Sequence, residues 1–148
     1  MDNVSAPSKR IVVGVDGSPA SVDALRWATR QAELTQCSVQ ALITWQVPNQ
    51  FGNDFYGDRF DWADLAQRTL ETALEEAGDG TPFTGDPVVL QGHPARSLVD
   101  VSHDAELLVV GSRGHGGFVG LLLGSVSEYV VAHANCPVLV IHHRKTQE

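Results

Sequence analysis

The sequence predicts an α/β fold: a Rossmann-like, three-layer sandwich in which helices cover both faces of a five-stranded parallel sheet. Short apolar runs rich in β-branched residues, such as Ile11–Val15, are typical of strands buried on both faces. Between such runs lie segments whose apolar or small residues recur at helical spacing, as Val22, Leu25, Thr29 and Ala32 do. Strands that alternate with helices form parallel sheets with helices on either side.

The first 91 residues of the chain contain three of the expected strands. After Ile11–Val15, Ser18 suits an N-cap and Pro19 suits the first helical position, so a helix begins there. Residues 48–59 lack periodicity and are expected to form a long loop, which in compact domains is often a lid or a binding segment. The remaining elements of this part are a strand at Ser38–Val47, a helix at Asp61–Ala77 and a strand at Pro87–Gln91.

The rest of the chain contains two strands and two helices. The turn Gly92-His93-Pro94, with His93 exposed, leads into a helix expected at Ala95–His103. Ser125 and Glu128 match the capping-box pattern, which predicts that Ser125 caps a helix at Ser125–Ala134. The two expected strands are Leu107–Val110 and the uninterrupted apolar run Val138–Ile141.

Length, charge and hydropathy narrow the class of protein. A chain of 148 residues is expected to form one domain, here residues 9–143, between a disordered tail at 1–8 and a polar tail at 144–148. The net charge of −8 argues against nucleic acid as a partner. No apolar run is long enough for a membrane span and the first ten residues are polar, so a cytoplasmic location is expected. Cys37 and Cys136 have no metal or redox spacing and are expected to be small buried core residues.

The most informative stretch follows the fourth expected strand. The apolar run stops at Gly111, several glycines follow within a few residues, and a helix is expected to start at Ser125. Glycines allow positive φ and let another molecule approach main-chain N–H groups, which together with a helix N-terminus bind anions well. Arg113 and His115 can add side-chain charge. This order predicts a phosphate site; the alternative is a flexible connector without a ligand.

Several catalytic and nucleotide-binding motifs are absent from the sequence. No glycine precedes a lysine, which excludes the standard P-loop. The dinucleotide pattern Gly-x-Gly-x-x-Gly fails because Val119 stands where its third glycine would be. Neither the nucleophile elbow Gly-x-Ser-x-Gly nor His-Glu-x-x-His occurs.

The spacing of the glycines is more specific than their number. Gly111, Gly114, Gly124 and Ser125 form the pattern Gly-x2-Gly-x9-Gly-Ser, which resembles the ATP-binding signature of the universal stress protein family. Residues 11–19, Ile-Val-Val-Gly-Val-Asp-Gly-Ser-Pro, are similar to that family's first strand and turn, and residues 136–141, Cys-Pro-Val-Leu-Val-Ile, to its last strand. The resemblance covers about residues 9–143 and implies the strand order 3-2-1-4-5.

The resemblance also implies roles for individual residues. Asp16 would hydrogen-bond the ribose or hold a metal ion, Mg²⁺ or Mn²⁺, through water; the alternative is a helix-dipole partner only. The main chain at Trp45 would contact adenine, while its side chain either joins that contact or packs in the core, and Thr44 is a weaker candidate. The candidate ATP-binding residues are Gly14, Asp16, Trp45, Gly111, Ser112, Arg113, Gly114, His115, Gly116, Gly117, Gly124, Ser125, Val126 and Ser127.

Three functional hypotheses remain open. The leading one is a regulatory protein that binds ATP with Mg²⁺ or Mn²⁺ and signals a stress or energy state. The second is a slow ATPase or phosphotransferase at the same site, and the third binds a flavin or an AMP-type ligand. A homodimer is also expected, because Val138–Ile141 would be an apolar edge strand; the alternative is a monomer whose tail or a loop hides that edge.

Overall fold

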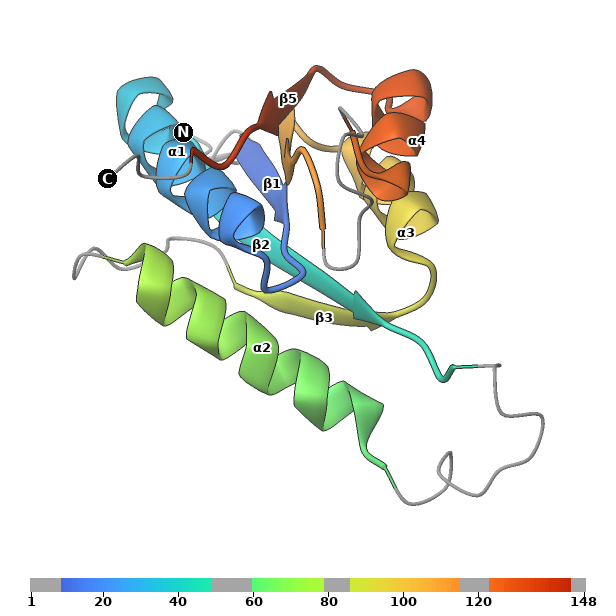
Figure 1. Ribbon diagram of the computed structural model, residues 1–148. Helices are drawn as coiled ribbons and strands as arrows, with labels where there is room; N and C mark the ends of the chain where they lie inside the picture. The colour runs from blue at the N-terminus through green and yellow to red at the C-terminus, as the bar shows by residue number, and fades with distance from the viewer. Residues whose placement is uncertain (1–8, 49–59, 79–85, 115–122, 145–148) are drawn as a thin grey trace, which may run out of the picture.

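A computed structural model of the chain describes residues 9–48, 60–78, 86–114 and 123–144. A five-stranded, all-parallel sheet in the order β3-β2-β1-β4-β5 forms its middle layer, which confirms the expected fold class and order (Figure 1). The strands are β1 (Arg10–Gly14), β2 (Ser38–Trp45), β3 (Val88–Gln91), β4 (Leu107–Gly111) and β5 (Val138–Ile141). The helices are α1 (Pro19–Thr35), α2 (Trp62–Ala77), α3 (Pro94–Ser102) and α4 (Ser125–His133).

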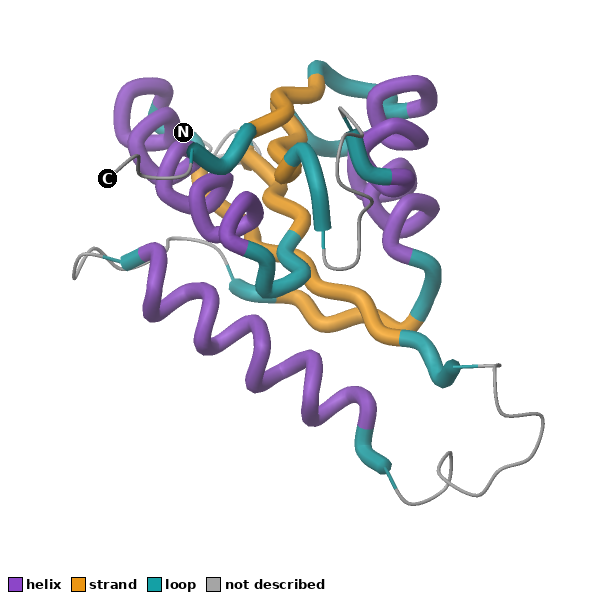
Figure 2. The backbone as a smooth tube through the Cα atoms, in the orientation of Figure 1, coloured by secondary structure: helices purple, strands orange, loops and turns teal. Residues whose placement is uncertain are grey.

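The helices pack in pairs on the two faces of the sheet (Figure 2). Alternate residues of the strands face opposite sides, which divides the core into two clusters. Ile11 and Val13 pack with α1 and α2 on one face, whereas Val12 and Leu108 pack with α3 and α4 on the other. Since β1 is central, its middle residues are fully buried, as the apolar run predicts.

Helix α1 begins and ends as local chemistry dictates. Ser18 is the N-cap, with its side chain accepting the Ser21 N–H, and Pro19 occupies the first helical position, as expected. The helix ends at Gln36, a residue in the left-handed region (φ 58°, ψ 35°) whose N–H donates to the Ala32 carbonyl. Helix ends in this conformation usually carry glycine, so Gln36 is an unusual C-cap.

Two expectations about these elements are wrong. The second strand was expected to continue to Val47, but it stops at Trp45. The Gly92 N–H donates to the Trp45 carbonyl, and β3 ends at Gln91, so the following residues have no partner strand there. Ser125 does not cap α4, because Gly124 occupies the N-cap position and Ser125 is already the first helical residue.

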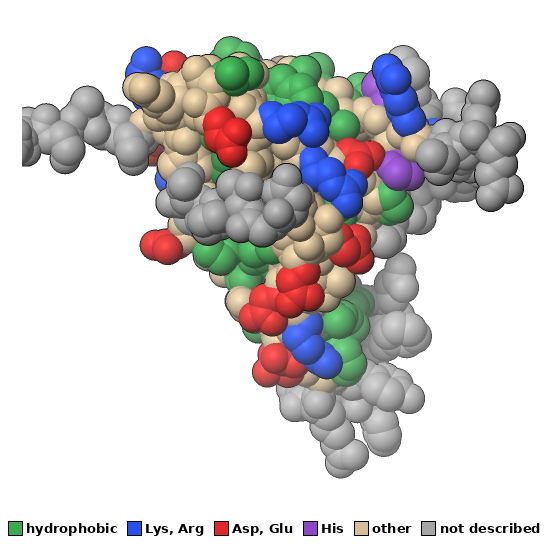
Figure 3. Space-filling view, turned by 90° about the vertical axis from the view of Figure 1, so that its left-hand side faces the viewer, with side chains coloured by type: hydrophobic (Ala, Val, Ile, Leu, Met, Phe, Trp, Pro, Cys, Tyr) green, Lys and Arg blue, Asp and Glu red, His purple; other side chains and the backbone are tan. Residues whose placement is uncertain are grey.

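The cysteines are half-buried and unbonded to each other rather than fully buried as expected. Burial raises the pKa of the Cys136 thiol above its ordinary value. Figure 3 shows the side of the molecule on which α1 and α2 lie, where acidic side chains gather over α2 in the lower half of the view. Among the residues described, no helix combines the length and apolar character that a membrane span requires.

Candidate functional site

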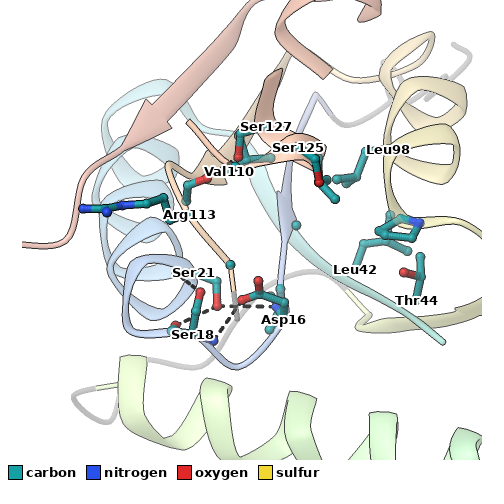
Figure 4. Close-up of a pocket in the computed structure, with 17 residues that line it drawn as sticks. Asp16, Ser18, Ser21, Leu42, Thr44, Leu98, Val110, Arg113, Ser125 and Ser127 are labelled. Carbon is teal, nitrogen blue, oxygen red and sulfur yellow. Dashed lines mark hydrogen bonds between the residues drawn. The ribbon is translucent and has the colours of Figure 1, made fainter. Parts of the chain in front are cut away.

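A cavity of about 490 Å³ opens where the carboxyl ends of β1 and β4 meet (Figure 4). The chain leaves β1 toward α1 on one face and β4 toward α4 on the other, so the two connections part here. Ligands of open parallel sheets bind at such switch points. The volume lies within the range of small-molecule sites. Five further segments complete the lining, namely the turn into α1, the second half of β2, the first half of α3, the residues that follow β4 and the first turn of α4.

The turn between β1 and α1 is closed by its own side chains. Asp16 Oδ1 accepts the Ser18 N–H at 2.9 Å, and Ser21 Oγ donates to the Ser18 carbonyl at 2.9 Å. Ser18 Oγ also accepts the Ser21 N–H. The N–H groups at the start of α1 therefore find acceptors on nearby side chains of the chain itself (dashed lines in Figure 4). The second carboxylate oxygen of Asp16 lies against Gly114, and within the described part of the chain no hydrogen bond uses it.

The N-terminus of α4 is left open by the residues that the structure describes, in contrast to that of α1. Gly124 supplies no side-chain cap, and the first N–H groups of a helix have no acceptor inside it. These groups belong to residues 125–127, all of which line the cavity. The positive end of the α4 dipole therefore lies at the cavity wall, where an anion would satisfy it.

Two hydrogen bonds hold the start of α4 against the end of β4. The Gly124 N–H donates to the Ser112 carbonyl at 2.7 Å, and Ser127 Oγ donates to the Gly111 carbonyl at 2.5 Å. Ser112 and Ser127 are both buried. The open helix end is thus fixed in place before any ligand arrives.

The three signature glycines serve different purposes, and none of them has positive φ. A Cβ on Gly111 would lie 2.8 Å from Ala20 Cβ, so glycine there lets α1 pack closely on β4. A Cβ on Gly114 would collide with the carboxylate of Asp16. A Cβ on Gly124 would make only ordinary contacts, the nearest at 3.5 Å, so nothing within the described residues requires glycine at that position.

The opposite end of the cavity is mainly apolar. Leu42 and Thr44 of β2 and Leu98 of α3 lie on one side of it (Figure 4), and Pro94 of α3 and Val110 of β4 also belong to its lining. Of these, Thr44 brings a hydroxyl group. The cavity therefore has an apolar end that suits a flat ring and a polar end that suits an anion.

Charged groups contribute little to the described lining. Asp16 is its one carboxylate, and the Arg113 side chain extends away from the cavity (Figure 4). No three metal-binding side chains come together anywhere in the described ranges. The free oxygen of Asp16 fits Mg²⁺ or Mn²⁺ only if a ligand's phosphates and water complete the coordination, which is how Mg²⁺ is usually held beside nucleotides.

The structure brings most of the candidate residues together. Ser112 supports the site through its backbone but is not part of the lining. Trp45 packs against the core on the α1 side and borders a neighbouring groove, whereas Thr44 lines the cavity. Three candidates, His115, Gly116 and Gly117, lie outside the described residues, as does all of the expected long loop at 48–59 except Pro48. The candidates that line the cavity are Gly14, Asp16, Gly111, Arg113, Gly114, Gly124, Ser125, Val126 and Ser127.

Seven lining residues were not identified as site residues from the sequence: Val15, Ser18, Ser21, Leu42, Pro94, Leu98 and Val110. Leu42 and Thr44 lie two residues apart on β2 and so share a face, and Val110 is adjacent to Gly111. Leu42 could have been found from strand alternation, and Val110 from its place at the end of β4. Pro94 and Leu98 carry no such signal, because only the packing of α3 brings them to the cavity.

Fold and cavity together define a parallel α/β protein with a ligand site at its switch point, and comparison with known proteins agrees. The family model described as "Universal stress protein family" matches residues 7–142. A universal stress protein of Mycobacterium tuberculosis (strain ATCC 25618 / H37Rv) is 38% identical over 144 residues, which cover 89% of this chain and 47% of that protein. The chain belongs to the universal stress protein family, and it spans about half the length of the curated relatives it matches.

Solved structures share the fold. A universal stress protein in complex with cAMP matches with a TM-score of 0.70 at 24% identity, covering 94% of this chain and 100% of that one. A universal stress protein from Archaeoglobus fulgidus in complex with dAMP matches with a TM-score of 0.60 at 21% identity, covering 91% of this chain and 98% of that one.

Proposed function

We propose that this protein binds ATP in the cavity between β1 and β4 and acts as a nucleotide-dependent regulator in the cytoplasm. The observation that carries the proposal is the open N-terminus of α4 at one end of a cavity whose other end is apolar. A nucleotide has the same two-part character, a flat base and a charged phosphate chain. The complexes of family members with cAMP and dAMP support an adenine nucleotide as the ligand class.

The proposed orientation follows from the lining. Adenine would lie between Leu42 and Leu98, where apolar surface is available on both sides. The phosphates would accept hydrogen bonds from the first turn of α4 and from the Ser125 hydroxyl, which also lines the cavity. The ribose would then fall beside Gly14 and Asp16.

A divalent cation is part of the proposal because of Asp16. Without a cation, the carboxylate would repel a triphosphate on a protein whose net charge is already −8. With Mg²⁺ or Mn²⁺ between them, the oxygen of Asp16 that makes no hydrogen bond in the described chain becomes a ligand for the metal, directly or through water.

We propose binding rather than turnover as the function. Phosphoryl transfer needs an oriented nucleophile and positive charge around the transferred group. The described lining contains one carboxylate and an arginine that points elsewhere, which favours a binding site. Slow hydrolysis is the alternative, and release of inorganic phosphate measured over hours at saturating ATP would reveal it.

The decisive test is to identify the ligand. Protein purified without added nucleotide is denatured and the supernatant is analysed by mass spectrometry, and calorimetry of emptied protein then compares ATP, ADP, AMP, cAMP and a flavin with and without Mg²⁺. We expect ATP with Mg²⁺ to bind most tightly. If AMP or cAMP binds most tightly, the cavity remains the nucleotide site but ATP is not its ligand. If a flavin binds most tightly, the proposal is overturned.

A further inference from the structure

The segment that follows β5 crosses toward α1 and is attached to it (Figure 1). His143 Nδ1 lies 2.6 Å from Asp23 Oδ2, and this contact joins the exit of β5 to the first half of α1. The two side chains are 43% and 27% exposed, so water screens their attraction only in part. Within the described residues this is the contact that fixes a side chain beyond the end of β5.

Asp23 is itself held in place by a second partner. Its other carboxylate oxygen accepts from Arg26 Nη1 at 3.0 Å, and Arg26 Nη2 donates to the Glu76 carbonyl in the last turn of α2 at 2.8 Å. His143 therefore binds a carboxylate whose position is set by two helices. Such a pre-positioned partner lowers the entropy lost in forming the contact.

The end of β5 is connected to the polar end of the cavity by two backbone hydrogen bonds. The Ile141 carbonyl accepts the Ser112 N–H at 2.8 Å, and the Ser112 carbonyl accepts the Gly124 N–H at 2.7 Å. Gly124 is the N-cap of α4. Ser112, which is buried, therefore links Ile141 at the end of β5 directly to Gly124 at the start of α4.

We infer that the contact between His143 and Asp23 is a latch that positions the phosphate end of the site, an inference that rests on the function proposed above. When the latch is closed, Ile141 holds Ser112, and Ser112 holds the N-cap of α4. When it is open, the segment beyond β5 is no longer joined to α1, and the Ile141 carbonyl is held only by its hydrogen bond with the Ser112 N–H. The apolar end is built mainly from β2 and α3, and neither element carries His143 or Asp23, so we expect adenine binding to depend on the latch much less than phosphate binding does.

The test compares two ligands in latch variants. Calorimetry with Mg²⁺ measures the affinities of ATP and of adenosine, which lacks phosphate, for the wild type, for His143→Ala, for Asp23→Ala and for the double variant. We expect each single change to weaken ATP binding about three- to tenfold, within the usual range for mutations that act on a site indirectly. Adenosine affinity should stay within about twofold, and the double variant should match the weaker single variant, because either change alone already removes the contact between His143 and Asp23.

Two further variants serve as controls. His142→Ala changes the neighbouring exposed histidine, for which no contact with Asp23 is seen, and should bind both ligands as the wild type does. His143→Gln keeps a side-chain donor and should recover part of the ATP affinity. Circular dichroism confirms that every variant is folded at the temperature of the titration.

The outcomes separate the latch from the proposed function. If the wild type binds ATP and His143→Ala binds it equally well, the latch is wrong and the nucleotide site stands. If ATP and adenosine weaken together, the contact is merely structural and the latch is also wrong. If the wild type binds neither ligand, the proposed function fails and the latch fails with it.

Discussion

Gly111 and Gly124 belong to one signature, but the structure assigns them opposite roles. Gly111 is needed by the fold, because a Cβ there would meet both the side chain and the backbone of Ala20 within 3.0 Å. Gly124 has room for a Cβ and an ordinary φ of −70°. We therefore attribute glycine at position 124 to the ligand, which must approach the backbone closely.

Alanine substitutions test this division of roles. Gly111→Ala should lower the free energy of unfolding by about 1–3 kcal/mol, as overpacking does, measured by urea denaturation. Gly124→Ala should unfold as the wild type does but bind ATP at least about tenfold more weakly, which is about 1.4 kcal/mol. Equal ATP affinity in a folded Gly124→Ala variant would remove this backbone from the site.

Substitution of Asp16 should change ATP affinity in opposite directions with and without a divalent metal ion. Asn can still accept the Ser18 N–H, so Asp16→Asn keeps the turn and removes only the charge. With Mg²⁺, ATP binding should weaken about tenfold; with EDTA, it should tighten, because the repulsion between carboxylate and phosphate is gone. The same change in affinity under both conditions would show that Asp16 is not a metal ligand.

At the scale of elements, α4 shows where sequence patterns stop being informative. The Ser-x-x-Glu pattern is present, yet the helix begins one residue earlier than a cap at Ser125 requires. The reason is tertiary, since the Ser112 carbonyl fixes the Gly124 N–H and places Gly124 at the N-cap. A capping box concerns local residues only and contains no information about that bond.

Two serine substitutions in α4 should therefore differ. Ser125→Ala removes no cap, so the free energy of unfolding of the empty protein should change by less than about 0.5 kcal/mol, while ATP binding weakens. Ser127→Ala removes a buried hydrogen bond to the Gly111 carbonyl and should cost about 1–3 kcal/mol of stability. Thermal and urea unfolding of both variants without nucleotide would check this, and equal destabilisation would contradict it.

The positions of the strands could be predicted well from the sequence. Which face of a strand lines the cavity could be predicted less well. The apolar runs of β1 and β4 identify buried parallel strands directly, and that of β5 identifies a parallel strand whose residues are half-buried. On β2, Thr44 and Trp45 face opposite sides, and the family resemblance alone did not decide which side the cavity occupies. That choice depends on where α3 packs, which is a property of the whole domain.

For the whole molecule, the open edge of the sheet is the feature with the largest consequence for assembly. β5 is an edge strand and its apolar residues are half-buried. The carbonyl of Pro137 accepts the N–H of Leu108 in β4, and that of Ile141 accepts the N–H of Ser112, which follows β4. Because successive residues of a strand point their backbone groups to opposite sides, those of Val138 and Val140 face outward. We propose that two copies pair here as an antiparallel homodimer.

Proline substitutions at neighbouring positions test the homodimer. Val140→Pro removes an outward N–H and should shift the protein from dimer to monomer in sedimentation velocity, with the fold retained. Leu139→Pro is the matched control, because its N–H faces β4 and its loss should destabilise the monomer itself. A wild type that is monomeric at high micromolar concentration would end the proposal.

The open end of α4 also bears on the energetics of the empty protein. A helix whose first N–H groups have no acceptor frays there, so amide hydrogens of residues 125–127 should exchange with solvent faster than those of the self-capped first turn of α1. A bound phosphate would then serve as the missing cap. At a free ligand concentration 100 times Kd, binding adds about 2.7 kcal/mol to the free energy of unfolding, and part of this gain would be visible as slower exchange in that single turn. The nucleotide would in this sense complete a secondary-structure element that the polypeptide leaves unfinished.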